Sequence, residues 1–158
     1  MQTLNELGHH GHSGVMMWPG GEFGYRKNLL PTFVQPWNPA WNWTLRVDTV
    51  ISWILNADMP VNLAMLYIEE PDMHAHAFGP DSPEVANQIQ KLDTLVGYLI
   101  QQLKDKQLSE SVDVFLVSDH GMATTEEKNI IDLSTFTNQT MYKKVGTSPV
   151  IHVFPKEG

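Results

Sequence analysis

The clearest periodic pattern in the chain is a run of apolar residues at spacings of three and four. That spacing places them on one face of an α-helix. Ser82 followed by Pro83 fits an N-cap residue with proline in the first turn, which is a strong helix start. The sequence therefore predicts a long helix whose apolar face packs in the core and binds no cofactor. The positions on that face are Val85, Ile89, Leu92, Leu95, Val96, Leu99, Ile100 and Leu103.

Two short apolar runs on either side of this helix predict buried strands. Residues 62–68 and 112–117 are rich in aliphatic, β-branched and aromatic side chains and are bounded by turn residues. The connection between them is long enough for a right-handed parallel crossover. A further helical pattern covers 45–55. A short strand is predicted around 149–154, where it is expected to extend the sheet.

The N-terminal part of the chain follows no such pattern. Residues 8–44 are rich in Gly, Pro, His, Trp and Asn, and turns in them are marked by Gly20-Gly21, Pro31, Pro36 and Pro39. A loop region of this length inside a compact domain is usually a binding surface. We therefore predict one catalytic domain over 1–158, with 8–44 as a loop-rich substrate side and 45–155 as an α/β core.

Composition narrows the class of protein. With 158 residues, 42% of them apolar and 18% charged, the chain suits one globular domain. A net charge of −8 argues against a binder of nucleic-acid polymers, which would need a basic stripe. This net charge does not exclude a small phosphate-containing substrate, because a bound divalent metal reverses the local electrostatic field. The lack of cysteine excludes a thiol nucleophile, a cysteine-ligated zinc and a disulfide framework.

The sequence features that bear on cellular location do not agree with one another. The sequence contains no run of about 18 or more apolar residues, and its N-terminus lacks the basic and apolar regions of a signal peptide. Asn42-Trp43-Thr44 and Asn138-Gln139-Thr140 both match the acceptor pattern for N-glycosylation. Because such matches arise often by chance, they shift the expectation towards secretion only slightly.

Two acidic–histidine clusters follow the two predicted strands. Asp72-Met73-His74-Ala75-His76 lies in a predicted loop over 69–80, and Ser118-Asp119-His120-Gly121 comes directly after 112–117. The carboxyl ends of parallel strands are where α/β proteins place their sites. Carboxylate oxygen and imidazole nitrogen suit zinc or another first-row divalent ion. The clusters therefore predict either one crowded metal site or a pair of metals a few ångströms apart.

Other interpretations of the clusters remain open. Two loops of solvated polar residues would carry no site at all. A Ser/His/Asp arrangement of Ser118, His76 and Asp119 lacks the Gly-x-Ser-x-Gly elbow that usually accompanies it. A glycosidase carboxylate pair of Glu69 with Asp119 has no further feature in its support.

The clusters and their surroundings resemble the ecto-nucleotide pyrophosphatase/phosphodiesterases. Leu66 to His76, closed by Gly79-Pro80, is similar to one signature of that family, and Val117 to Met122 is similar to the other. Gly8 to Gly20 is similar to the segment that precedes them, and the resemblance extends over nearly the whole chain. It implies a partial alkaline-phosphatase-like α/β core, in which a mostly parallel sheet is flanked by helices and carries two zinc ions.

The resemblance also implies roles for individual residues. Four positions match zinc ligands of the family, in two pairs: Asp72 with His76, and Asp119 with His120. His74 falls at a position that the family does not use for metal. Trp37 and Phe78 are implied to lie at the substrate, Phe78 because an aromatic residue commonly follows the second ligand.

The implied activity is zinc-dependent hydrolysis of phosphodiester or pyrophosphate bonds in nucleotides or phospholipid headgroups. In the family a metal-activated threonine attacks phosphorus, and the phosphothreonine is then hydrolysed. The threonine, a further ligand aspartate and a C-terminal ligand histidine belong to segments outside the match, and His152 is not assigned to the last role. We therefore expect an internal fragment of a family member that is inactive by itself; a non-catalytic metal-binding or regulatory domain is the alternative.

The resemblance sets further expectations about partners and location. The substrate is expected to be a nucleotide or a choline phosphodiester, and no nucleic-acid polymer is expected to bind. The expected location is extracellular or at the cell surface, with membrane attachment only through segments that are not in this chain.

Overall fold

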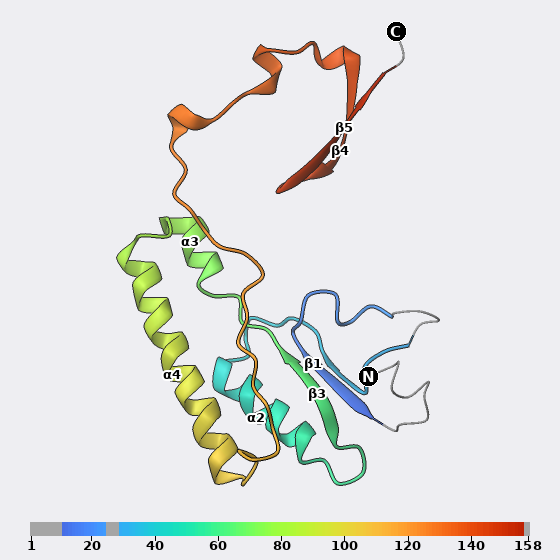
Figure 1. Ribbon diagram of the computed structural model, residues 1–158, viewed down its shortest axis with the longest axis vertical. Helices are drawn as coiled ribbons and strands as arrows, with labels where there is room; N and C mark the ends of the chain where they lie inside the picture. Colours follow the sequence, from blue (N-terminus) through green and yellow to red (C-terminus); the bar gives the residue numbers. More distant parts are fainter. Residues whose placement is uncertain (1–10, 25–28, 157–158) are drawn as a thin grey trace. The chain divides into compact units, whose positions relative to one another are not determined.

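The computed structural model describes residues 11–24 and 29–156. The chain divides into two compact units, Met1–Ala123 and Thr124–Gly158. Strands β1 to β3 and helices α2 to α4 belong to the first unit, and strands β4 and β5 belong to the second (Figure 1). The two units are described separately below.

A parallel sheet forms the centre of the first unit. Its strand order is β2 (Phe33–Gln35), β1 (His12–Met16) and β3 (Val61–Leu66), and β1 runs parallel to both neighbours. The predicted parallel sheet and the strand near 62–68 are therefore confirmed. Strands β1 and β2, however, lie in the region predicted to be loop. Both are short, and β1 begins with polar residues, so neither shows the apolar run of a buried strand.

Helix α2 (Trp43–Ile54) packs on this sheet and confirms the helix predicted over 45–55. It begins earlier than predicted because the side chain of Asn42 accepts a hydrogen bond from the backbone N–H of Leu45 at 2.8 Å, which caps the first turn. The ring of Trp53 lies directly over the backbone of β1. A carbon added at Gly14 would stand 2.5 Å from Trp53 Cε3, so this close approach requires glycine.

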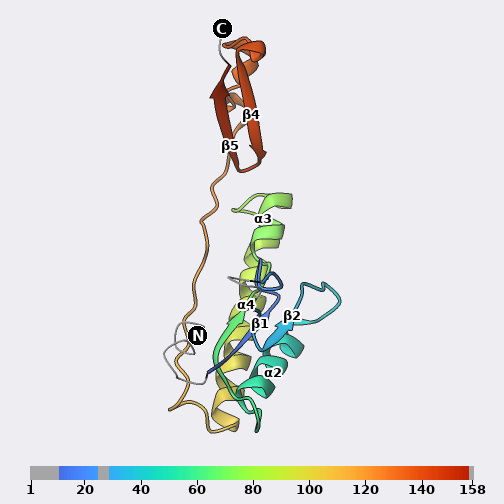
Figure 2. The same cartoon turned by 90° about the vertical axis from the view of Figure 1, so that its right-hand side faces the viewer.

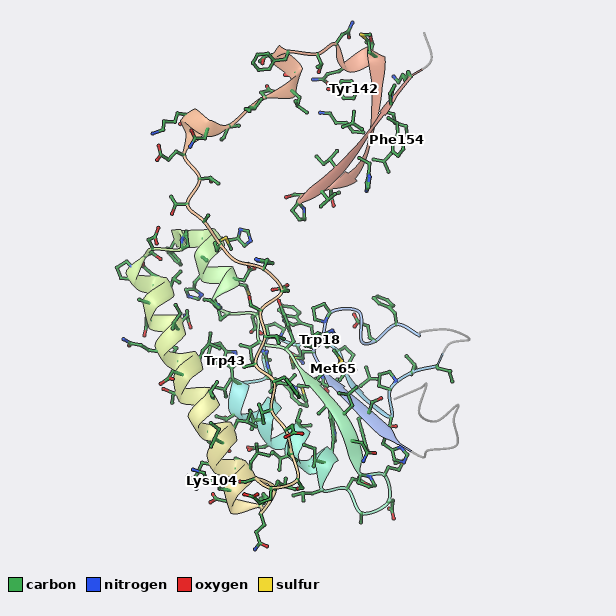
Figure 3. All side chains as sticks on the ribbon, in the orientation of Figure 1. Trp18, Trp43, Met65, Lys104, Tyr142 and Phe154 are labelled. Atoms are coloured by element: carbon green, nitrogen blue, oxygen red, sulfur yellow. The ribbon has the colours of Figure 1, made fainter. Side chains whose placement is uncertain are left out.

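Helix α4 (Pro83–Asp105) confirms the long predicted helix, including its Ser82 cap. Its buried residues Leu95 and Leu103 pack against Val47 and Ile51 of α2, and Trp43, labelled in Figure 3, packs against this cluster. The buried face is narrower than predicted, because other positions of the apolar stripe, such as Ile89 and Ile100, are exposed. In the part of the chain that the structure describes, no helix is both long and apolar enough to cross a membrane.

Residues 112–117 do not form the predicted strand, and the predicted strand–helix–strand crossover is therefore absent from the described residues. Figure 2 shows this segment as an extended trace that follows α4. Phe115 and Leu116 are 86% and 81% exposed. A strand needs a neighbour to pair its N–H and C=O groups, and among the described strands β3 pairs with β1 alone. The local pattern is that of a strand, but no described strand pairs with this segment, and the second edge of β3 is left unpaired.

The predicted loop over 69–80 contains a short helix, α3 (Asp72–Phe78). This helix lacks the usual N-cap signal, because Pro71 at its N-cap supplies no side-chain hydrogen bond. Helix α3 packs against α4 and presents the first acidic–histidine cluster.

The second unit is an antiparallel hairpin preceded by three short 3-10 turns. The turns are η1 (Glu127–Asn129), η2 (Leu133–Thr135) and η3 (Gln139–Met141), and the strands are β4 (Tyr142–Thr147) and β5 (Val150–Pro155). The strand predicted around 149–154 is confirmed as β5. It pairs with β4 in a separate two-stranded sheet, so the expectation that it extends the parallel sheet is wrong.

Two glycine substitutions test the packing of α2 on the sheet. Gly14→Ala places a methyl carbon 2.5 Å from Trp53 Cε3, well inside van der Waals contact, so we expect the free energy of unfolding to fall by about 1–3 kcal/mol. Gly97→Ala is the matched control, because nothing lies within 4 Å of the added carbon in the interior of α4. There alanine should stabilise by about 0.5–1 kcal/mol. Urea unfolding measures both values, and equal effects of the two substitutions would contradict this packing.

Candidate metal centre

The two acidic–histidine clusters meet around one carboxylate oxygen. Asp72 and His76 lie one turn apart on α3, so their side chains share one side of that helix. His76 Nε2 lies 3.4 Å from Asp72 Oδ1. From the second cluster, His120 Nε2 lies 3.6 Å from the same oxygen and 3.9 Å from Asp119 Oδ1. The fold thus brings together all four of the predicted metal ligands.

The oxygen at the centre of this group is buried without a hydrogen-bond partner. Among the described residues, Asp72 Oδ1 is the one side-chain atom with this property. A buried carboxylate oxygen costs free energy unless a cation or a donor lies beside it. Carboxylate oxygens and imidazole nitrogens are a donor set that zinc accepts, so the chemistry of these residues fits a metal ion.

The side chains are gathered but are not arranged in a closed coordination shell. Within residues 11–24 and 29–156, no group of three or more His, Cys, Asp or Glu side chains has a geometry that could hold a metal ion. His76 and Asp119 are 69% and 80% exposed, so both side chains have room to turn. These exposed groups must therefore rotate before an ion is enclosed.

The ring of His120 is oriented by its own backbone. Nδ1 donates a hydrogen bond to the carbonyl of Gly121 at 2.9 Å, which leaves Nε2 directed at Asp72. This hydrogen bond, followed by the charge of Asp119, raises the pKa of His120; desolvation opposes the rise and Asp72 adds to it. A backbone hydrogen bond at one ring nitrogen is the usual way in which a metal-binding histidine is held.

The structure disfavours the two other catalytic interpretations of these residues. Ser118 Oγ donates to the carbonyl of His120 at 2.6 Å, so the hydroxyl is not directed at the ring of His76. Glu69 accepts hydrogen bonds from both terminal nitrogens of Arg46, at 2.5 and 3.0 Å. A carboxylate held in this way is a poor partner for Asp119 in a glycosidase pair.

The buried ion pair of Arg46 with Glu69 was missed by the sequence reasoning. Arg46 is 1% exposed and also donates to the carbonyls of Trp41 and Tyr67. Burial by itself raises the pKa of Glu69. The hydrogen bonds and charge of Arg46, with a backbone hydrogen bond and one from Trp43, together outweigh burial, and the net pKa is lowered. The pair ties α2 to the segment between β3 and α3. A cation within the apolar pattern of 45–55 was the available signal.

Tyr67 is a second neighbour of the centre that sequence reasoning did not single out. Burial raises the pKa of its hydroxyl, and the charges of Asp119, Asp72 and Glu69 raise it further. Its position directly after β3 therefore places a protonated hydroxyl in the field of the clustered carboxylates.

The remaining candidate residues lie around the centre or outside it. Trp37 and Phe78 are 53% and 55% exposed, and their predicted contact with a substrate remains a prediction. His74, within the first cluster, contacts Glu70 and Gln88 and none of the four predicted ligands. His152 belongs to β5 of the second unit, where its ring lies 6.3 Å from that of Phe154.

Comparison with known proteins identifies the family. The model of the type I phosphodiesterases/nucleotide pyrophosphatases matches residues 2–158. The chain belongs to this family. The family is of the metallohydrolase type.

Relatives and solved structures agree with this assignment. The chain is 38% identical over 156 residues to human ectonucleotide pyrophosphatase/phosphodiesterase family member 5, covering 99% of this chain and 32% of that protein. It is 32% identical over 155 residues to human bis(5'-adenosyl)-triphosphatase, covering 98% of this chain and 34% of that protein. Murine ectonucleotide pyrophosphatase/phosphodiesterase 5, solved as an inactive threonine-to-alanine variant with AMP, matches with a TM-score of 0.85 and 36% identity, covering 99% of this chain and 41% of that one.

These matches confirm the predicted fold class. The mixed α/β arrangement, with a parallel sheet flanked by helices, is that of the solved relatives. The chain spans about a third of the length of the curated relatives it matches. The activity, substrates and partners of a whole family member are therefore only proposed for this chain.

The lowered pKa of Glu69 predicts how stability changes with pH. Because the folded-state pKa lies below the ordinary 4.5, ionised Glu69 stabilises the fold above that pH, and this contribution is lost as pH falls through the folded-state value. We expect Glu69→Gln to lower the urea midpoint at neutral pH and to reduce the loss of stability below pH 4.5. Glu110→Gln, at an exposed carboxylate after α4, is the control. Parallel pH profiles for the wild type and Glu69→Gln would rule out this role.

Proposed function

We propose that this chain carries part of the two-metal centre of a zinc-dependent phosphodiesterase/nucleotide pyrophosphatase. The reaction is hydrolysis of phosphodiester or pyrophosphate bonds in small nucleotides. One observation carries the proposal: in a chain of this family, two imidazole groups converge on a buried carboxylate oxygen of Asp72 that has no hydrogen-bond partner among the described residues.

The four clustered side chains would bind two metal ions, one ion for each pair. Asp72 with His76 would hold one Zn²⁺, and Asp119 with His120 would hold the other. When bound, such ions neutralise charge on phosphoryl oxygens and activate a nucleophile. Among the chain's own residues, Gly121 orients His120 by a hydrogen bond to its ring, and the ion pair of Arg46 with Glu69 fixes the segment that leads into α3.

A nucleotide is the favoured substrate class. A solved relative binds AMP, and a second relative is named for cleaving a bis(5'-adenosyl) triphosphate. The exposed aromatic rings of Trp37 and Phe78 are suited to stacking on a base. A choline phosphodiester is the other substrate that the family resemblance implies, and nothing in the described residues favours it.

The 158-residue chain by itself is proposed to be inactive. A threonine-to-alanine variant of the murine relative is inactive, which supports a threonine nucleophile in that protein. The family resemblance places that threonine outside the segments matched here. Turnover of a p-nitrophenyl nucleotide ester above a metal-free control would contradict this, whereas zinc binding without turnover also fits a non-catalytic metal-binding domain.

Zinc binding is the direct test of the proposed centre. We expect the purified chain to bind Zn²⁺ with an affinity well below that of a complete family site, because each ion has too few protein ligands. Asp72→Ala and His120→Ala should each weaken binding by at least about tenfold, as losses at metal sites commonly do. His152→Ala, in the hairpin of the second unit, is the matched control. Calorimetric titration after chelator treatment measures all four proteins, and equal affinities would exclude this centre.

We also propose an extracellular or cell-surface location, with a glycan at Asn42. Asn42 is exposed, and its side-chain oxygen accepts from Leu45 N at 2.8 Å and from Thr44 Oγ1 at 3.0 Å. Glycosylation takes place at the side-chain nitrogen, so the cap of α2 and the sugar use different atoms of one amide. The folded chain can therefore carry the modification without loss of the helix cap.

The glycan is tested by secreting the chain from animal cells behind an added signal sequence. We expect a loss of mass on treatment with peptide N-glycosidase, and conversion of Asn42 to aspartate in the released peptide. Thr44→Ala should abolish the modification, whereas Thr44→Ser keeps the required hydroxyl and should retain it. An unmodified Asn42 in the secreted protein would contradict the proposal.

A further inference from the structure

His74, which the metal centre does not use, is held in a polar network beside it. Its Nδ1 lies 2.6 Å from Glu70 Oε1, and its backbone N–H donates to Glu70 Oε2 at 3.2 Å. Its Nε2 lies 2.8 Å from the side-chain nitrogen of Gln88 on α4. The side chain of Glu70 is 8% exposed and Gln88 is 7% exposed, so both partners are buried and their bonds are costly to lose.

The contacts specify which nitrogen of the neutral ring carries the proton. The side-chain nitrogen of Gln88 can donate but cannot accept, so Nε2 of His74 must be the acceptor. The proton of the neutral imidazole then lies on Nδ1, which donates to Glu70. Both ring nitrogens are therefore used, and neither is left for a metal ion.

Helix α3 has little else to hold it in place. It has seven residues, its N-cap residue makes no side-chain hydrogen bond, and Ala75 is its one buried residue. A helix of this length is not stable without outside contacts. Glu70 supplies the missing cap by accepting from the N–H of His74, and the ring of His74 reaches across to α4.

The geometry of the helix places this network opposite the predicted ligands. Asp72 and His76 are separated by four residues and share one side of α3. His74 is two residues from each, which at about 100° per residue turns it to the other side. One side of α3 is therefore fastened to α4, while the other side presents Asp72 and His76 to His120.

We propose that His74 is a positioning residue. Held as the Nδ1–H tautomer between Glu70 and Gln88, it fixes the orientation of α3 and thereby the placing of Asp72 and His76 for metal. The inference rests on the proposed function where it concerns metal, whereas the fastening of α3 can be tested without any metal.

The metal-free arm of the test observes the ring and the helix directly. Nitrogen-15 NMR of the imidazole groups at neutral pH should show the Nδ1–H tautomer for His74. His74→Phe and Gln88→Met should each speed amide hydrogen exchange in α3 by about tenfold or more, because the helix opens locally. Met73→Ala, at an exposed position of the same helix, is the control and should leave exchange unchanged. An Nε2–H tautomer of the neutral ring, or unchanged exchange in both variants, would overturn the inference.

Measurements of metal binding distinguish a positioning role of His74 from a merely structural one. His74→Phe should weaken Zn²⁺ binding by about tenfold and alter the visible spectrum of bound Co²⁺, which reports the ligand geometry. The double variant with Gln88→Met should lose no more than His74→Phe alone, because the two residues act through one contact. Faster exchange with unchanged zinc affinity and an unchanged Co²⁺ spectrum would overturn positioning and leave the metal centre standing. A wild-type chain that binds no zinc would instead remove the proposed function, and positioning for metal with it.

Discussion

The buried ion pair of Arg46 with Glu69 is the contact on which the geometry of the first unit depends. Arg46 sits in the first turns of α2 at 1% exposure, and Glu69 lies between β3 and α3. The guanidinium also satisfies two backbone carbonyls, so the charge is neutralised and its donors are used. Loss of one partner from a buried pair leaves the other charge without compensation, which typically costs about 3–5 kcal/mol. The pair therefore fixes where the chain leaves the sheet and enters α3.

The elements that the sequence predicted well are those defined by local patterns. Helix α4 has a regular stripe, a serine cap and a proline in its first turn, and it was recognised with nearly its observed bounds. Strand β1 was missed because His12 and Ser13 begin it and Gly14 sits where Trp53 covers the backbone. That strand is recognisable from its pairing with β2 and β3, which a local pattern does not contain.

The prediction for residues 112–117 is wrong in the opposite sense, because a strand is expected there and none is present. Its composition is that of a buried strand, yet the side chains of Phe115 and Leu116 are exposed and no described strand pairs with its backbone. Strand propensity describes how well a residue fits a pleated, half-buried surface, and it cannot create that surface. The second acidic–histidine cluster follows this segment directly. The motif could thus be read from the sequence, whereas the support of the backbone that carries it could not.

The candidate site likewise has one part that short motifs predict and one part that depends on a contact between two helices. The four predicted ligands were found from two short motifs, and the fold gathers them around Asp72. The separate role of His74 could not be predicted, because it depends on Gln88, which a different helix brings to the ring. What distinguishes the three histidines is the use of their nitrogens. His74 has both engaged by protein groups, His120 has one engaged by Gly121, and the second nitrogen of His120, like Nε2 of His76, faces Asp72. A histidine with both nitrogens satisfied serves the fold, and one with a nitrogen directed at a buried carboxylate oxygen is available for a cation. By this criterion the cluster contains one structural imidazole and two whose second ring nitrogen is directed at Asp72, as the proposed metal centre requires.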